Sequence, residues 1–236
     1  PKTKCIVINS PSNPTGAVSS EEDIRAIFEI AEAHNLFILS DEIYSTIVYE
    51  GRHFSPGVLD RSSERVIVTN GFSKPFAMTG WRVGYAVGPV NVIDKIGLLS
   101  QTIVSCVPPF LQDACVVALK NKKEFSERYS IVYKKLRDIV CDALSKSEEI
   151  SFAKPAGAFY CMIDVSGTGL NGDMFADYLL KEEGVVVCPG SGFGPSGANY
   201  VRICYARPEP EIKEGCEKIV RVARDLATCL SSRFSL

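Results

Sequence analysis

A short apolar run that leads into a basic loop is the feature that most limits how this chain can fold. Residues 65–70 (Arg-Val-Ile-Val-Thr-Asn) read as a buried strand closed by Gly71, so Lys74 follows the carboxyl end of a strand and Arg82 comes shortly after it. Open α/β sheets bind their ligands at that end of their strands. A lysine held near an arginine there suits an anionic ligand that carries a carbonyl group, whereas either residue alone is more often an ordinary surface charge or part of a strand.

Two upstream strands also end in polar residues. The strand that starts with the β-branched residues 6–8 breaks into an Asn-Pro-Thr-Gly turn at 13–16, and the strand at 37–40, which begins with three apolar residues, is followed by Asp41 and Tyr44. Taken separately, Asn-Pro is a common turn and aspartate after a strand is a common helix cap. Three strands that deliver polar groups to one edge of a sheet favour a ligand site instead.

These motifs, in this order, resemble the class I/II aminotransferases, the fold-type I enzymes that depend on pyridoxal phosphate (PLP). They are Asn-Pro-Thr-Gly at 13–16, Asp-Glu-Ile-Tyr at 41–44 and Ser-Lys-x5-Gly-x-Arg at 73–82, and the similarity continues through 154–160, 187–194 and 200–206. The resemblance implies an α/β fold: part of the PLP-dependent transferase large domain, with a mainly parallel sheet and helices, followed by a smaller α+β C-terminal domain.

The resemblance also assigns roles around the cofactor PLP. Lys74 is the predicted catalytic residue, since its amine would bond to the PLP aldehyde and then move the proton at the substrate Cα. Asp41 would keep the pyridine nitrogen protonated. Tyr44 and Asn13 would donate hydrogen bonds to the 3-oxygen of the ring. Arg82 would offer its planar, permanently charged fork to the phosphate.

Two further positions complete the predicted site, and one departs from the family pattern. Arg202 matches the family's segment that grips the substrate α-carboxylate, with Asn13 also placed at the substrate. Ser73 is expected to bind the phosphate, although a loop cap explains it equally well. The family commonly has a hydroxyl residue three positions before the lysine; Gly71 stands there, so the phosphate site is expected to be altered.

Composition excludes several other classes of protein. The chain has 236 residues, 46% of them hydrophobic, with 26 basic and 28 acidic side chains and no basic stripe, so we expect no nucleic-acid partner. No apolar run approaches a membrane span, and there is no signal-peptide pattern. The nine cysteines lack metal-ligand spacing and read as reduced thiols, so we predict no metal site and a cytoplasmic location.

The pattern along the chain predicts two domains. We expect strands near 5–10, 36–40, 65–70 and 81–87, the last antiparallel by resemblance. A helix between the first two strands would start at a Ser19–Glu22 capping box. Residues 1–110 would form the C-terminal part of the PLP-binding domain. Residues 111–236 would form a connecting helix and a small domain, with strands near 150–152, 157–164, 185–188 and 200–205 and helices near 172–182 and 209–230.

The leading hypothesis is a PLP-dependent aminotransferase of amino-acid metabolism. It would exchange an amino group between an aspartate-like, aromatic or broader range of α-amino acids and a 2-oxo acid such as 2-oxoglutarate. Two alternatives stay open: a fold-type I carbon–sulfur lyase, and a non-catalytic aminotransferase-like binding fragment. The resemblance implies that the chain is the C-terminal portion of a longer enzyme. It also implies a homodimer, with residues 103–110 as a candidate contact.

Overall fold

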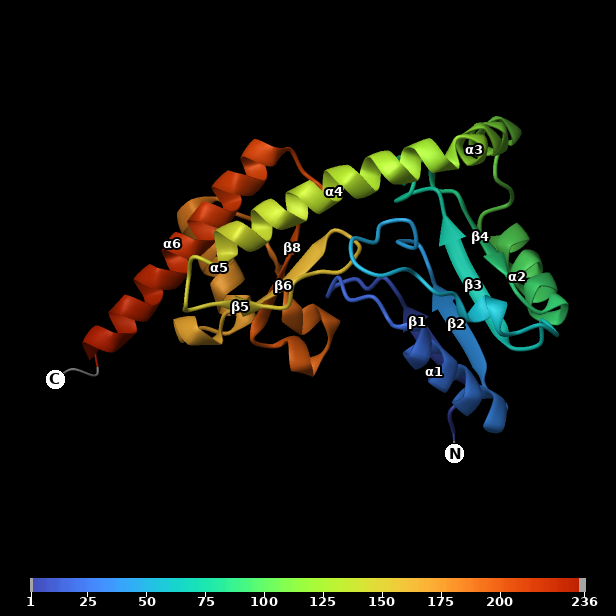
Figure 1. Cartoon of the computed structure of the whole chain (residues 1–236), viewed down its shortest axis with the longest axis horizontal. Helices are drawn as coiled ribbons and strands as arrows, with labels where there is room; N and C mark the ends of the chain where they lie inside the picture. Colours follow the sequence, from blue (N-terminus) through green and yellow to red (C-terminus); the bar gives the residue numbers. More distant parts are fainter. Residues whose placement is uncertain (1, 234–236) are drawn as a thin grey trace. The chain divides into compact units, whose positions relative to one another are not determined.

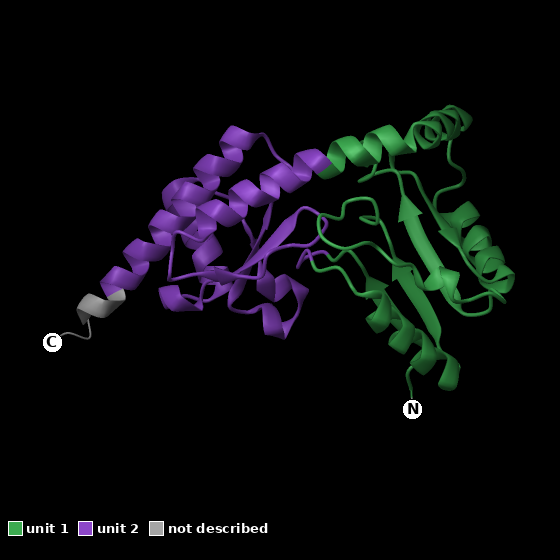
Figure 2. Cartoon of the chain, in the orientation of Figure 1, with its two compact units in different colours: residues 1–12, 17–130 green, residues 13–16, 131–236 purple. Residues whose placement is uncertain are grey.

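The computed structural model describes residues 2–233, which divide into two compact units (Figures 1 and 2). Unit 1 comprises the chain up to Ser12 and then Ala17–Ser130, and unit 2 comprises Asn13–Gly16 and the chain from Ile131 onward. The sequence places the boundary at residue 110 instead. The segment around Phe125 remains with unit 1, because the ring of Phe125 packs edge-on against the ring of Phe76, with the ring centroids 5.7 Å apart.

Unit 1 is built on a four-stranded sheet with the strand order β1-β2-β3-β4. Its strands are β1 (Cys5–Asn9), β2 (Phe37–Asp41), β3 (Val66–Gly71) and β4 (Gly84–Val87). The first three strands are parallel and β4 is antiparallel to β3, which confirms the mixed sheet expected from the resemblance. Consequently β1, β2 and β3 present their carboxyl ends at the same edge.

Helix α1 (Glu21–Ala33) connects β1 to β2 and packs on the sheet (Figure 1). Its buried residues Ile24 and Ala31 join a core cluster with one residue from each parallel strand: Ile8, Ile38 and Val66. The predicted capping box at Ser19 was wrong by one residue. The cap is Ser20, whose hydroxyl accepts from the Asp23 amide. Ser19 instead donates its amide N–H to the Ser10 hydroxyl oxygen, which removes it from the helix start.

Three helices follow β4 and lead into unit 2. They are α2 (Val90–Ile103), α3 (Pro109–Lys120) and α4 (Lys122–Leu144). The Pro108-Pro109 pair separates α2 from α3: Pro108 is the N-cap residue of α3, and Pro109 occupies its first turn, where a missing N–H costs least.

Unit 2 contains a second four-stranded sheet with the order β5-β6-β8-β7, in which all neighbours are antiparallel. Its strands are β5 (Ser151–Phe152), β6 (Tyr160–Asp164), β7 (Cys188–Pro189) and β8 (Tyr200–Cys204), and its helices are α5 (Gly172–Glu183) and α6 (Glu209–Arg233). Fully buried side chains from these elements form the core: Ile163, Phe175, Leu179, Val201 and Ile219. This is the α+β domain that the sequence predicts.

Short 3-10 turns complete the described structure, namely η1 (Pro56–Val58), η2 (Thr79–Trp81), η3 (Ser166–Thr168), η4 (Gly190–Phe193) and η5 (Pro195–Gly197). Within residues 2–233, no helix is both long and apolar enough to cross a membrane.

Candidate active site

The carboxyl ends of the parallel strands align polar residues in register. Asn9 at the end of β1 pairs with Asp41 at the end of β2, and Asp41 pairs with Thr69 of β3. Strand alignment therefore places an amide, a carboxylate and a hydroxyl side by side at the edge where open α/β sheets bind ligands.

The turn that carries Lys74 is fixed by two phenylalanines. Phe72 and Phe76 are buried against Cys115 and Ala118 of α3, and their rings stack with a centroid distance of 5.4 Å. The Phe76 amide also donates to the Phe72 carbonyl over 3.3 Å. Because the anchoring residues point into the core, the half-buried Lys74 faces the end of the sheet.

Gly71, which departs from the family pattern, lies where two strands approach each other closely. It pairs with Gly84 across β3 and β4. A Cβ atom at position 71 would lie 3.0 Å from the Val83 carbonyl oxygen and 3.1 Å from the Gly84 Cα. A side chain at position 71 would thus require the neighbouring backbone to move slightly away.

Arg82 reaches the same place through an unusual backbone conformation. It follows the η2 turn with φ 55° and ψ 44°, in the left-handed region that side-chain-bearing residues rarely adopt. Its Nη1 atom donates to the Thr79 carbonyl over 2.9 Å. This folds the guanidinium back over the turn. Strain of this kind persists where surrounding structure enforces it, and it clusters at binding sites.

One cavity of about 430 Å³ brings four of the predicted residues together. Asp41, Ser73, Lys74 and Arg82 all line it, and three further polar side chains border it: Thr69, Asn70 and Thr79. The lining of the cavity therefore offers one amine, one guanidinium, one carboxylate and several hydroxyl or amide groups. Such a set suits a ligand that carries a phosphate, a protonated ring nitrogen and an aldehyde.

The carboxylate of Asp41 is held by two donors. Asn9 Nδ2 lies 3.1 Å from Oδ2, and the Ile43 amide donates to Oδ1 over 3.2 Å. Strand-end reasoning could have found Asn9, because it follows an apolar run just as Asp41 does. Its neighbour Ser10 donates a backbone N–H to the Asp41 carbonyl over 3.3 Å, which joins the two strand ends further.

A buried acid next to Asp41 secures the turn after β2. Glu42 accepts from the Ser40 hydroxyl over 3.1 Å and the Ser55 hydroxyl over 2.5 Å, and its Oε2 lies 3.0 Å from His53 Nε2. Burial raises the pKa of the Glu42 carboxyl, but the contact with His53 and the hydrogen bond from Ser55 outweigh it, so the pKa lies below its usual value. Glu42 thus stays ionised at neutral pH. Its contacts with Ser40, His53 and Ser55 hold the segment that also carries Tyr44.

Tyr44 is not among the residues that line the cavity. Its side chain is 3% exposed, and its carbonyl accepts the Ile47 amide in the turn that follows β2. The structure therefore places it in unit 1, close in sequence to Asp41, while its predicted bond to the cofactor stays a prediction.

The other two predicted residues meet in unit 2. Arg202 on β8 donates from Nη1 to Asn13 Oδ1 over 2.7 Å. The Arg202 Cζ atom also lies over the rings of Tyr160 and Phe193, at 4.6 Å and 4.9 Å from their centroids. Both rings escaped the sequence analysis, because no local pattern links residues so far apart along the chain.

The Asn-Pro-Thr-Gly turn is attached to unit 2 through its glycine. The Gly16 carbonyl accepts the amides of Ala156 and Gly157, each over 2.9 Å. Gly16 has φ 71°, and a Cβ atom there would lie 2.6 Å from Pro155 Cβ and 2.8 Å from the Tyr160 carbonyl oxygen. Only glycine tolerates that approach, so this residue fixes Asn13 near Arg202.

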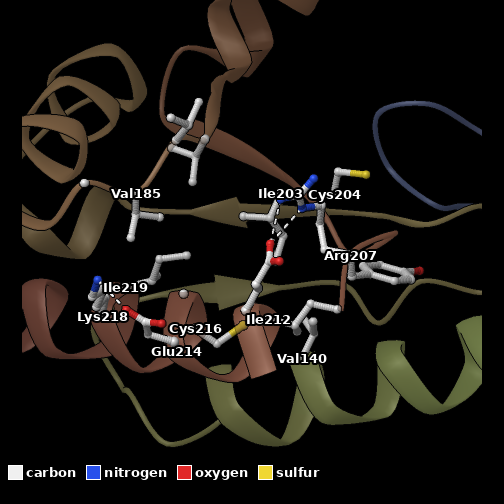
Figure 3. Close-up of a pocket in the computed structure, with 16 residues that line it drawn as sticks. Val140, Val185, Ile203, Cys204, Arg207, Ile212, Glu214, Cys216, Lys218 and Ile219 are labelled. Carbon is white, nitrogen blue, oxygen red and sulfur yellow. Dashed lines mark hydrogen bonds and ion pairs between the residues drawn. The ribbon is translucent and has the colours of Figure 1, made fainter. Parts of the chain in front are cut away.

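A second cavity, of about 480 Å³, lies in unit 2 among β8, α6 and the segment after α5 (Figure 3). Its lining is largely aliphatic, and its charged groups form pairs four residues apart: Arg207, just before α6, with Glu211, and Lys218 with Glu214. None of the predicted site residues lines it. The cavity in unit 1 is therefore the better candidate for an anionic ligand.

Comparison with known proteins gives a consistent result. The family described as "Aminotransferase class I and II" matches residues 1–219. The chain is 39% identical to "Aromatic-amino-acid aminotransferase 2" of Thermococcus litoralis over 95% of this chain and 58% of that protein. It is 37% identical to "Aspartate aminotransferase" of Pyrococcus abyssi, again over 95% and 58%. The crystal structure of an aromatic aminotransferase from Pyrococcus horikoshii OT3 superposes with a TM-score of 0.91 at 38% identity, over 95% of this chain and 61% of that one. The chain thus spans about 58% of the length of these curated relatives.

Proposed function

This chain belongs to the class I and II aminotransferases, and from that membership we propose that it carries the cofactor-binding and substrate-binding residues of a PLP-dependent aminotransferase. One observation carries the proposal: Asp41, Ser73, Lys74 and Arg82 line a single cavity at the carboxyl ends of the parallel strands. A non-catalytic binding fragment would not require an amine at this position.

The residues of this cavity fit PLP by their chemistry. Arg82 would hold the phosphate through its fork of N–H donors, with the Ser73 hydroxyl as a second donor. Thr79, which also borders the cavity, offers a hydroxyl that compensates for the one missing at Gly71. Asp41 would accept from the protonated ring nitrogen, and Asn13 and Tyr44 are proposed as donors to the ring oxygen.

PLP, when bound, supplies an aldehyde that bonds to amino groups and an aromatic ring that accepts electrons from the substrate Cα. The protein has two tasks in this reaction. The Lys74 amine removes the proton from the substrate Cα and later delivers a proton as a general acid. The Asp41 carboxylate stabilises positive charge on the ring nitrogen through its fixed orientation.

Arg202 is the proposed binding group for the substrate α-carboxylate. A planar guanidinium can grip both carboxylate oxygens and so fix which bond at Cα faces the catalytic amine. Its contact with Asn13 supports this role, because Asn13 is itself a predicted substrate-binding residue. The relatives named above act on aromatic amino acids or on aspartate according to their names, so we propose a donor of one of these kinds and 2-oxoglutarate as an acceptor.

We further propose a cytoplasmic homodimer. The cytoplasmic location rests on the nine cysteines, which suit a reducing compartment. The dimer rests on the end of α2 and the start of α3, where Ile103, Val104 and Phe110 are 76%, 62% and 69% exposed. Large apolar side chains gathered in one segment are typical of a contact surface.

Product analysis of the purified natural protein with PLP tests the reaction type. With a panel of amino acids and 2-oxoglutarate, an aminotransferase forms glutamate and the 2-oxo acid of the donor in equal amounts. A carbon–sulfur lyase instead releases ammonia without glutamate. A binding fragment forms neither product, and that result would overturn the proposal.

A further inference from the structure

The guanidinium of Arg202 lies over two aromatic rings that come from different segments of unit 2. In the sheet of unit 2, β8 lies between β6 and β7. Tyr160 is the first residue of β6, and Phe193 ends the η4 turn that follows β7. Both rings lie close to the guanidinium, with Cζ 4.6 Å and 4.9 Å from their centroids.

The N–H donors of Arg202 are only partly used by hydrogen bonds within the described structure. Nη1 donates to Asn13 Oδ1 over 2.7 Å. Nε is shielded from solvent and has no hydrogen-bond partner among the described residues. A buried donor without an acceptor is costly, so the Arg202 guanidinium keeps hydrogen-bonding capacity that the described residues do not use.

We propose that Tyr160 and Phe193 form an aromatic clamp that fixes the Arg202 guanidinium and makes its site select a planar carboxylate over a tetrahedral anion. The inference rests on the proposed function, in which Arg202 binds the substrate carboxylate. Tyr160 and Phe193 are positioning residues, because they act through Arg202.

The selectivity follows from the shapes of the groups. The two rings block part of the space around the guanidinium. An anion can therefore reach the N–H groups only along the edge of the guanidinium that the rings leave open. Two carboxylate oxygens match two N–H donors in one plane. A sulfonate carries a third oxygen outside that plane, and this oxygen meets a ring. Removing either ring opens space for it and also frees the arginine to move, which weakens the binding of both anions.

The test compares two small anions that carry the same ethyl group, propanoate and ethanesulfonate. Their dissociation constants are measured by NMR titration on the PLP-loaded protein, for the wild type and for Phe193→Leu, Tyr160→Leu and Tyr160→Phe. Tyr178→Leu is the matched control, because Tyr178 lies on α5 of the same unit and is 39% exposed, against 40% for Phe193.

We expect the wild type and Tyr178→Leu to bind propanoate about tenfold more tightly than ethanesulfonate. The ratio should fall to about twofold in Phe193→Leu and Tyr160→Leu, and Tyr160→Phe, which keeps the ring, should restore most of it. A merely structural role for the rings would lower thermal stability without changing this ratio. Because Phe193 is partly exposed, its replacement supplies a folded variant even if Tyr160→Leu fails to fold.

Arg202→Lys separates failure of the clamp from failure of the proposed function. If this variant loses propanoate binding while Phe193→Leu keeps the wild-type ratio, the clamp is overturned and the role of Arg202 stands. If Arg202→Lys binds propanoate as the wild type does, Arg202 is not the carboxylate site, and the clamp falls together with the proposed substrate-binding role of Arg202.

Discussion

The Nδ2 atom of Asn9 lies 3.1 Å from the Oδ2 atom of Asp41, and the two residues are direct partners in the register of β1 and β2. The second oxygen of Asp41 accepts the Ile43 amide. Both carboxylate oxygens are thus oriented by the sheet and its following turn before any ligand binds. Such preorganised charge is what electrostatic stabilisation of a reacting group requires.

Replacement of Asn9 by alanine should lower kcat while leaving the fold intact. The variant loses a hydrogen bond to a charged group, a contact worth about 1.5–3 kcal/mol, so we expect a loss of about tenfold or more in turnover. Steady-state kinetics and circular dichroism measure the two effects. Asn121→Ala, at an exposed asparagine before α4, serves as the control. Unchanged kcat in Asn9→Ala would show that Asp41 needs no such support.

Lys74 should be the residue that bonds to PLP. Borohydride reduction of the PLP-loaded protein, followed by peptide mapping, should place the pyridoxyl group on Lys74. Lys122→Ala, which removes an exposed lysine of α4, should leave the label where it is. A label on any other lysine would reject the assignment of the whole cavity.

Asp41→Asn should retain the fold but lose most of the turnover. The amide keeps the size of the side chain and an acceptor for the Ile43 N–H, yet it carries no negative charge for the ring nitrogen. Loss of such a charge partner costs about 3–5 kcal/mol at the transition state, or several hundredfold in rate. Near-normal kcat, measured at saturating PLP, would refute this role.

Local patterns predict the parallel strands of unit 1 well, because each is a short, mainly apolar run bounded by turn residues. Residues 65–70, for instance, were expected as a strand, and β3 covers Val66–Gly71. The start of β4 was misplaced at residue 81, since the structure forms the η2 turn there and Arg82 adopts a left-handed conformation. Hydrophobic patterning carries no information about such a turn.

The residues of the candidate site could be predicted where they directly follow a strand, because open α/β sheets bind ligands at the carboxyl ends of their strands. That rule, with the family resemblance, selected Asp41, Lys74 and Arg82, and the structure gathers them around one cavity. It did not find Tyr160 and Phe193, because their proximity to Arg202 depends on the non-sequential strand order of unit 2. Their roles, like those of the other site residues, stay predictions until the variants are measured.

The stability of the fold should depend on Glu42 at acidic pH. Its pKa in the folded protein lies below the ordinary value of 4.5, so its ionised form stabilises the fold above that pH, and this contribution disappears as the pH falls further. Denaturant unfolding between about pH 5 and about pH 3 should show a flatter pH dependence for Glu42→Gln than for the wild type.

The matched control for this measurement is Glu29→Gln, at an exposed glutamate of α1. It should keep the wild-type slope. If Glu42→Gln also keeps that slope, the cluster with His53 and Ser55 does not stabilise the ionised form.

The exposed apolar segment at the junction of α2 and α3 should be a dimer contact. A charge placed there would have to be buried on association, so Phe110→Glu should shift the protein from dimer to monomer in light scattering. Val58→Glu, at a residue of η1 that is 61% exposed, should leave the dimer intact. An active monomer of the wild type would contradict the interface.

The chain passes between its two units at residues 12–13, 16–17 and 130–131. Neither unit is therefore one uninterrupted stretch of the described chain, and recombination at residue 130 would not transfer unit 2 whole. A graft that begins there would leave behind the Asn13 oxygen that Arg202 contacts and the Gly16 carbonyl that accepts two amides. Chimeras between members of this family should retain a working arginine only when the chain outside the graft supplies a four-residue turn that keeps this asparagine and this glycine.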